Sequence, residues 1–129
     1  MDLEKIKHIA KLCRQKVISQ YELYEDDSLY GLCAIASACL YEDLNKNGIR
    51  SEFKISELSN QKHVYLSIDD INIDITASQF GFGPIEINKN KDQPWNHYLR
   101  FQTPAELHKY LKSINWNTEQ LFELGSHVF

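Results

Sequence analysis

The sequence predicts an α+β fold, with N-terminal helices packed on a small antiparallel β-sheet and further helices at the C-terminus. Apolar residues recur at helical spacing in two segments before residue 49. Between residues 49 and 76 they alternate with polar residues instead, as in strands with one buried face. A strong helix-start signal then follows at Thr103. This order predicts helices on one side of the sheet.

Two N-terminal segments are predicted to be helices because each carries one apolar face. Residues 2–18 have Asp2 as the N-cap and an apolar face made of Leu3, Ile6, Ile9, Ala10, Cys13 and Val17. The second helix ends at Asn47-Gly48 and buries Leu32, Ile35, Ala36, Cys39, Leu40 and Leu44. Two of the three cysteines, Cys13 and Cys39, are therefore expected in the core.

Three strands are predicted over residues 49–56, 63–68 and 71–76. A tight turn at Asp69-Asp70 joins the last two into a hairpin. One face of this hairpin is apolar, and the other carries His63, Tyr65, Ser67, Asn72, Asp74 and Thr76 pointing outward. Residues 88–102 are polar and are expected to be irregular.

The C-terminal part begins with Thr103-Pro104, which places an N-cap Thr before a Pro at the first helical position. Glu106 completes a capping box, and this helix is expected to end near Ser113. A last short helix, capped by Asn117 or Thr118, is expected to end at Gly125. We see no internal repeat in the sequence, so residues 1–129 are predicted to form a single domain.

Composition excludes several classes of protein. The chain has 129 residues, of which 43% are hydrophobic and 12% aromatic, so disorder is not its main state. The longest apolar stretch, residues 29–41, is shorter than the ~20 residues that span a membrane. A formal net charge of −4 disfavours nucleic-acid binding.

Three cysteines without a secretory signal indicate free thiols in a reducing compartment. We therefore expect a cytoplasmic protein, with secretion by a signal-independent route left open. The cysteines form no CxxC motif or zinc-like cluster with histidine, so neither a metal nor a cofactor is expected.

Cys33 lies in the first turn of the predicted second helix and off the apolar stripe of that helix. The partial positive charge and unpaired N–H groups of a helix N-terminus favour a thiolate and can bind an oxyanion. Gly31 lets the backbone turn sharply into the helix. These features indicate a nucleophile, although Cys33 taken alone is also well explained as a small buried helix residue.

The predicted hairpin would supply partners for this thiol. With a turn at residues 69–70, His63 and Asp74 become diagonal neighbours on its polar face, about 7–8 Å apart at the backbone. Asp74 can then accept a hydrogen bond from one ring nitrogen of His63 and leave the other for chemistry.

Cys33 at a helix start, His63 opening a strand and the sequence IDITASQF at residues 73–80 resemble the transglutaminase-like branch of the papain-like cysteine enzymes. The resemblance covers residues 29–80. It implies a catalytic triad in which Cys33 is the nucleophile, His63 the general base and acid, and Asp74 the orienting carboxylate. It also implies acyl transfer at an amide: peptide hydrolysis, glutamine deamidation or crosslinking.

The chain departs from the pattern of that family at two points. Many members have a Trp two residues after the His, where this chain has Tyr65. Papain uses a Gln upstream of the cysteine to bind the oxyanion, and no Gln here has a matching motif around it. The N–H of Cys33 is the expected donor, with Gln20 and Tyr30 as further candidates and Gln79 as a candidate cleft residue.

Two classes of function follow from this sequence. The first is a small cysteine peptidase, glutamine deamidase or transglutaminase that acts on a protein or peptide, of a size typical of a bacterial or phage effector. The second is a catalytically silent acidic binding module on the same fold, such as an immunity or inhibitor protein. An acyltransferase with a thioester donor ranks last, because no basic or Gly-rich site for coenzyme A is apparent.

Overall fold

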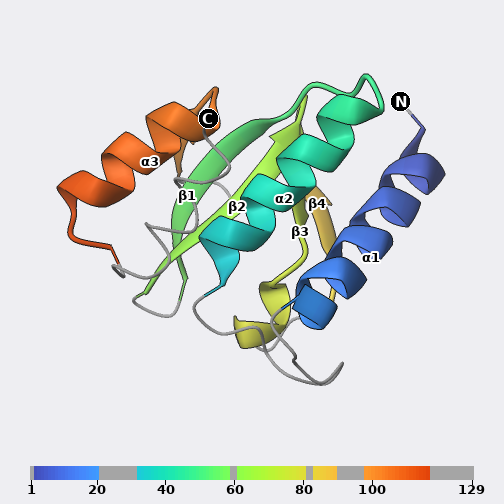
Figure 1. The fold of residues 1–129 in the computed structure, drawn as a ribbon, viewed down its shortest axis with the longest axis horizontal. Coiled ribbons are helices and arrows are strands. Elements are labelled where there is room, and N and C mark those ends of the chain that lie inside the picture. Colours follow the sequence, from blue (N-terminus) through green and yellow to red (C-terminus); the bar gives the residue numbers. More distant parts are fainter. Residues whose placement is uncertain (1, 21–31, 59–60, 81–82, 90–97, 117–129) are drawn as a thin grey trace.

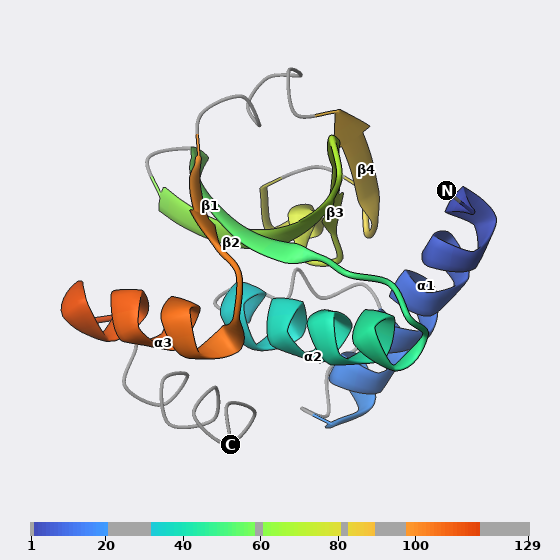
Figure 2. The same cartoon turned by 90° about the horizontal axis from the view of Figure 1, so that it is seen from above.

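The protein is described by a computed structural model over residues 2–20, 32–58, 61–80, 83–89 and 98–116. Within these ranges, three α-helices lie on one side of a curved five-stranded sheet (Figures 1 and 2). The elements in chain order are α1 (Leu3–Gln20), α2 (Cys33–Lys46), β1 (Glu52–Leu58), β2 (Gln61–Ile68), β3 (Ile71–Asp74), the 3-10 helix η1 (Ala77–Phe80), β4 (Glu86–Lys89), β5 (Leu99–Phe101) and α3 (Pro104–Ser113). The predicted α+β class, with helices on a small antiparallel sheet, is confirmed.

The sheet has the strand order β4-β3-β2-β1-β5, and every neighbouring pair is antiparallel. β1 to β4 follow one another as a meander, and the chain then crosses to the opposite edge, where β5 pairs with β1. The prediction that residues 88–102 are irregular is wrong where β4 and β5 lie. These strands have four and three residues, too few for alternation to be recognised, and they form by pairing with β3 and β1.

The predicted β2–β3 hairpin has the expected register, from Leu66 opposite Ile73 to Ile68 opposite Ile71. Asp69, the first turn residue, has a φ of 54°, a conformation that Asp tolerates better than most residues. β3 ends at Asp74, two residues earlier than predicted. The reason is local, because the Asp74 carboxylate accepts a hydrogen bond from the backbone N–H of Thr76 and turns the chain out of the strand.

The first strand also differs from its prediction, since β1 begins at Glu52 and not at Ile49. The N–H of Ile49 instead donates to the carbonyl of Leu44, which closes the end of α2. Gly48 lies between them with a φ of +72°, as expected for the stop signal of that helix.

The core lies between α1, α2 and one set of alternating strand residues. Its strand residues include Phe53, Ile55, Val64, Leu66 and Ile73, and its helix residues include Ile6, Cys13, Val17, Ile35 and Leu40. The predicted core positions of Cys13 and Cys39 are confirmed, and none of the three cysteines forms a disulfide.

The second set of alternating residues is buried as well, which corrects the expectation that they point outward. His63, Tyr65, Asn72 and Asp74 are all at most 2% exposed. Lys54, which pairs with Tyr65 across the strands, is 1% exposed. This face of the sheet therefore carries polar side chains that are shielded from solvent.

α2 is the central helix and is buried on all sides along its first half. Every residue from Cys33 to Leu40 is buried, because α1 packs on one side of α2 and β2 on another (Figure 1). The hydroxyl of Ser37 donates to the carbonyl of Val64 at 3.1 Å, so even the polar residue of this stretch is satisfied.

Helix starts follow the predicted signals. The Asp2 carboxylate accepts from the N–H of Lys5 at 3.0 Å, and the Thr103 hydroxyl accepts from the N–H of Glu106 at 3.2 Å. The return bond of the capping box goes to the N–H of Gln102, one residue earlier than the usual pattern.

Several predicted features lie outside the described residues: Gly31 and Tyr30, the short helix from Asn117 or Thr118 to Gly125, and most of the segment 88–102. Within the described part, no helix is long and apolar enough to cross a membrane.

The packing of α2 predicts a clear difference between two leucines. Leu40→Ala removes a side chain that is 1% exposed and should lower the free energy of unfolding by about 2–5 kcal/mol. The matched control Leu12→Ala, at a position 52% exposed, should change it by less than about 0.5 kcal/mol. Urea unfolding followed by circular dichroism measures both, and equal effects would contradict this account of the core.

Candidate active site

Cys33 is the first residue of α2, where packing holds it in the interior. Its side chain is 3% exposed, so the expectation that it faces away from the core is wrong. The N-cap residue Leu32 makes no side-chain capping bond to the helix. The first N–H groups of α2 lie beside the thiol, and groups of this kind can bind an oxyanion.

His63 and Asp74 meet as the hairpin register predicts. Nε2 of His63 hydrogen-bonds to Oδ2 of Asp74, and both side chains are almost fully buried. The other carboxylate oxygen, Oδ1, accepts from the N–H of Thr76 at 2.9 Å and from its hydroxyl at 3.2 Å. Asp74 thus has both oxygens occupied, which fixes the ring of His63.

The thiol of Cys33 joins this pair. Ser37, one turn further along α2, is bonded to the carbonyl that follows His63, and this contact brings the start of α2 to the start of β2. Burial alone would lower the pKa of His63, but the charge and hydrogen bond of Asp74, followed by those of Cys33, outweigh it and raise the pKa to about 10. Nε2 is the ring nitrogen that bonds Asp74, and Nδ1 is the other buried nitrogen of the ring.

The ring of Tyr65 packs against the imidazole of His63. Its ring stacks on that of His63 with centroids 6.1 Å apart and an interplanar angle of 20°. Its hydroxyl shares a hydrogen bond of 2.5 Å with Ser56, which lies opposite His63 in the ladder. Burial raises the pKa of Tyr65 to about 12, so it stays a neutral phenol. An aromatic ring thus occupies the position where the resemblance expects Trp.

Arg14 is a buried residue at the site that the sequence analysis missed. It is 5% exposed, and its guanidinium donates to the carbonyls of Ile75 and Pro84 at 2.5 and 3.2 Å. Arg14 therefore links α1 to the backbone before and after η1. The first of these bonded residues, Ile75, directly follows Asp74. A charged residue beside the apolar face of a helix is usually solvated, so nothing in the sequence distinguished it from its lysine neighbours.

Lys54 is the second residue that the sequence analysis did not single out. Its Nζ donates to Oδ1 of Asn72 at 3.3 Å and lies 3.9 Å from the centre of the Tyr98 ring. Burial lowers its pKa to about 8. A lysine in a strand normally points to solvent, and only the fold places this one inside.

The remaining predicted residues are not brought to the thiol. Gln20 ends α1 with an exposed side chain, a poor position for a donor to a buried thioester. Tyr30 and the side chain of Gln79 lie outside the described part. Burial raises the pKa of Cys39 to about 11 and that of Cys13 further still, so neither is a nucleophile at neutral pH.

Comparison of the chain with models of known families, with characterised proteins and with solved structures found no match. Across the residues that the structure describes, no group of three His, Cys, Asp or Glu side chains is arranged to hold a metal ion.

The first prediction for the site concerns the charge of His63. Asp74→Asn removes the negative charge that most strongly offsets the effect of burial on His63. The pKa of His63 should therefore fall from about 10 to below its ordinary value of 6.5. NMR titration of the imidazole measures this change. The control Asp70→Asn lies at the exposed hairpin turn and should leave the pKa unchanged. An unchanged pKa of His63 in Asp74→Asn would show that this carboxylate does not stabilise the protonated imidazole.

The second prediction concerns stability against pH. Because the pKa of His63 is higher in the folded chain, its ion pair stabilises the fold fully below pH 6.5, and this contribution is lost as pH rises toward about 10. Relative to His63→Gln, the free energy of unfolding of the wild type should therefore fall by roughly 1 kcal/mol per pH unit in this window. Urea unfolding at several pH values tests this, and parallel profiles would contradict it.

Proposed function

We propose that this chain is a cysteine-dependent acyl-transfer enzyme of the papain-like, transglutaminase-like type that acts on protein or peptide amides. One observation supports it most: Cys33 lies close enough to His63 to raise the pKa of that imidazole, and His63 is bonded to Asp74, all at the N-terminus of a central helix. A thiol beside an imidazole that a carboxylate orients is the arrangement that activates a nucleophile.

In the first half of the reaction, the Cys33 thiolate attacks the carbonyl carbon of the amide and a C–S bond forms. The negative charge that develops on the carbonyl oxygen is stabilised by the first N–H groups of α2, including that of Cys33. The intermediate collapses when the C–N bond breaks and the imidazolium of His63 transfers its proton to the leaving amine. A thioester on Cys33 remains.

In the second half, His63 acts as the base. The thiolate that helped to raise its pKa has become a neutral thioester, so the imidazole can now accept a proton from the incoming nucleophile. Water gives a carboxylic acid, and an amine gives a new amide. Attack on a glutamine side chain, with ammonia leaving, is deamidation in the first case and crosslinking in the second.

Asp74 keeps its charge throughout. Its two hydrogen bonds from Thr76 hold the carboxylate in place while His63 changes its protonation state. The role of Asp74 is therefore orientation and charge stabilisation of the ring, without proton transfer to the carboxylate.

A silent binding module is the second candidate, and one observation favours it: the Cys33 side chain is only 3% exposed. A substrate amide must reach this sulfur for catalysis, whereas a binding module has no such need. The two candidates differ in the reactivity of the thiol, which can be measured directly.

Iodoacetamide labelling near pH 6, followed by peptide mapping, provides the test. Cys33 should be alkylated at least ten times faster than Cys39, because the imidazole of His63 lies beside its thiol while burial raises the pKa of Cys39 to about 11. His63→Gln, which keeps a donor for Asp74, should reduce the rate at Cys33 to that of Cys39. The control His108→Ala on α3 should leave it unchanged.

Equally slow labelling of Cys33 and Cys39 in the folded wild type would reject the enzyme and leave the binding module. Circular dichroism of each variant shows whether the fold is retained, so that a lost rate is assigned to the imidazole and not to unfolding.

A further inference from the structure

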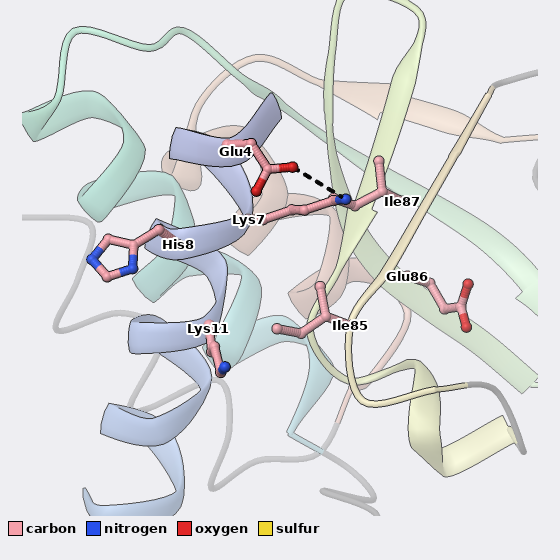
Figure 3. Close-up of a pocket in the computed structure, with 7 residues that line it drawn as sticks. All are labelled: Glu4, Lys7, His8, Lys11, Ile85, Glu86 and Ile87. Carbon is pink, nitrogen blue, oxygen red and sulfur yellow. Dashed lines mark ion pairs between the residues drawn. The ribbon is translucent and has the colours of Figure 1, made fainter. Parts of the chain in front are cut away.

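Arg14 lies where α1 runs beside the segment that leads into β4. One turn earlier on the helix, Lys11 lines a groove between these two segments together with Ile85 (Figure 3). Lys11 is exposed, whereas Arg14 is only 5% exposed. Burying a guanidinium costs more than a single hydrogen bond returns, so a buried arginine needs several partners. The partners of Arg14 therefore indicate what its burial stabilises.

The guanidinium of Arg14 bonds three points of the chain that follows Asp74. One terminal nitrogen donates to the carbonyl of Ile75 at 2.5 Å and to that of Pro84 at 3.2 Å. The other terminal nitrogen donates to the hydroxyl of Ser78 at 3.5 Å. The bond to Ile75 is the shortest of the three, and its donor carries a charge, which makes it the strongest as well.

A single peptide unit connects Arg14 to the carboxylate of Asp74. The carbonyl of Ile75 and the N–H of Thr76 belong to the same planar amide. Its oxygen accepts from Arg14, and its N–H donates to Oδ1 of Asp74 at 2.9 Å. A charged donor on the carbonyl polarises this amide and strengthens the bond that its N–H donates. The other oxygen of Asp74, Oδ2, is the one that bonds His63.

We propose that Arg14 is a positioning residue for the candidate active site, which fixes the peptide unit 75–76 so that the Asp74 carboxylate keeps Oδ2 on the imidazole of His63. Arg14 acts through this peptide unit and is not a catalytic residue. Its bonds to Ser78 and Pro84 hold the chain after β3 in place around the same turn. The effect on His63 stands by itself, whereas the effect on catalysis rests on the proposed function.

NMR titration of His63 separates positioning from a simple loss of charge. Removing a nearby cation would by itself raise the pKa of an imidazole. Loss of the oriented carboxylate acts in the opposite direction, because burial then outweighs a displaced Asp74. In Arg14→Met the pKa of His63 should therefore fall from about 10 to about 9 or lower. A pKa that stays the same or rises would overturn the proposal.

Two control variants on α1 show whether this effect is specific. Lys11→Met removes the same charge from an exposed position and should leave the pKa of His63 unchanged. Val17→Ala shortens a buried side chain, so it should lower the urea midpoint of unfolding without changing this pKa. If Val17→Ala lowers the pKa as much as Arg14→Met does, Arg14 only supports the packing of α1 and the positioning role is rejected.

A second variant, Arg14→Lys, keeps the positive charge and disturbs the fold less. The lysine side chain ends one bond short of the guanidinium nitrogen that holds Ile75, so the pKa of His63 should again fall. An unchanged pKa would overturn the proposal. Adding Arg14→Lys to Asp74→Asn should cause no further fall, because the carboxylate to be positioned is gone. A further fall would show that Arg14 acts on His63 by another route and would reject the proposal.

Iodoacetamide labelling near pH 6 tests the consequence for catalysis. Arg14→Lys should slow alkylation of Cys33 about tenfold relative to the wild type, and Lys11→Met should leave it unchanged. A fast rate that Arg14→Lys does not alter would reject the catalytic consequence. Slow labelling of Cys33 already in the wild type would reject the proposed function, while a fall in the pKa of His63 in Arg14→Lys would still support the positioning role.

Discussion

The buried contact between His63 and Asp74 constrains the rest of the structure. An ionised carboxylate and an imidazolium removed from water are tolerated only when each has its partner and its remaining hydrogen bonds. Asp74 meets this condition through Thr76 and His63, and His63 bonds Asp74 through Nε2. A one-residue slip of the hairpin would send the two side chains to opposite faces and leave two unpaired charges inside. The register of β2 and β3 is therefore held by polar as well as apolar residues.

The central helix α2 carries the thiol to this pair with little freedom to move. Its first eight residues are all buried, so the position of Cys33 is set by packing on α1 and β2 and not by a flexible side chain. Arg14 adds a second constraint, because it ties α1 to the carbonyls of Ile75 and Pro84. For the proposed acyl transfer, this restriction would favour a near-attack geometry.

The sheet has two distinct regions. Its polar interior positions hold Lys54, Tyr65 and Asn72. Lys54 bonds Asn72 two strands away and lies over the ring of Tyr98, and Tyr65 bonds Ser56 on the neighbouring strand. Its outer edge is β4, a short strand that lies next to α1. β3 joins these two regions, because it carries Asp74 and pairs with β4.

Local patterns in the sequence determined the helices, their caps and the β2–β3 hairpin, because helical spacing, strand alternation and turn residues act over a few positions. The same hairpin was enough to predict that His63 and Asp74 meet. Tertiary structure alone decided that β4 and β5 are strands, that Cys33 is buried, and that Arg14 and Lys54 lie inside. These features depend on partners distant in the chain: Arg14 bonds residues 61 and 70 positions away. A short or charged segment carries no local signal of such partners, so its burial is decided only when the layers assemble.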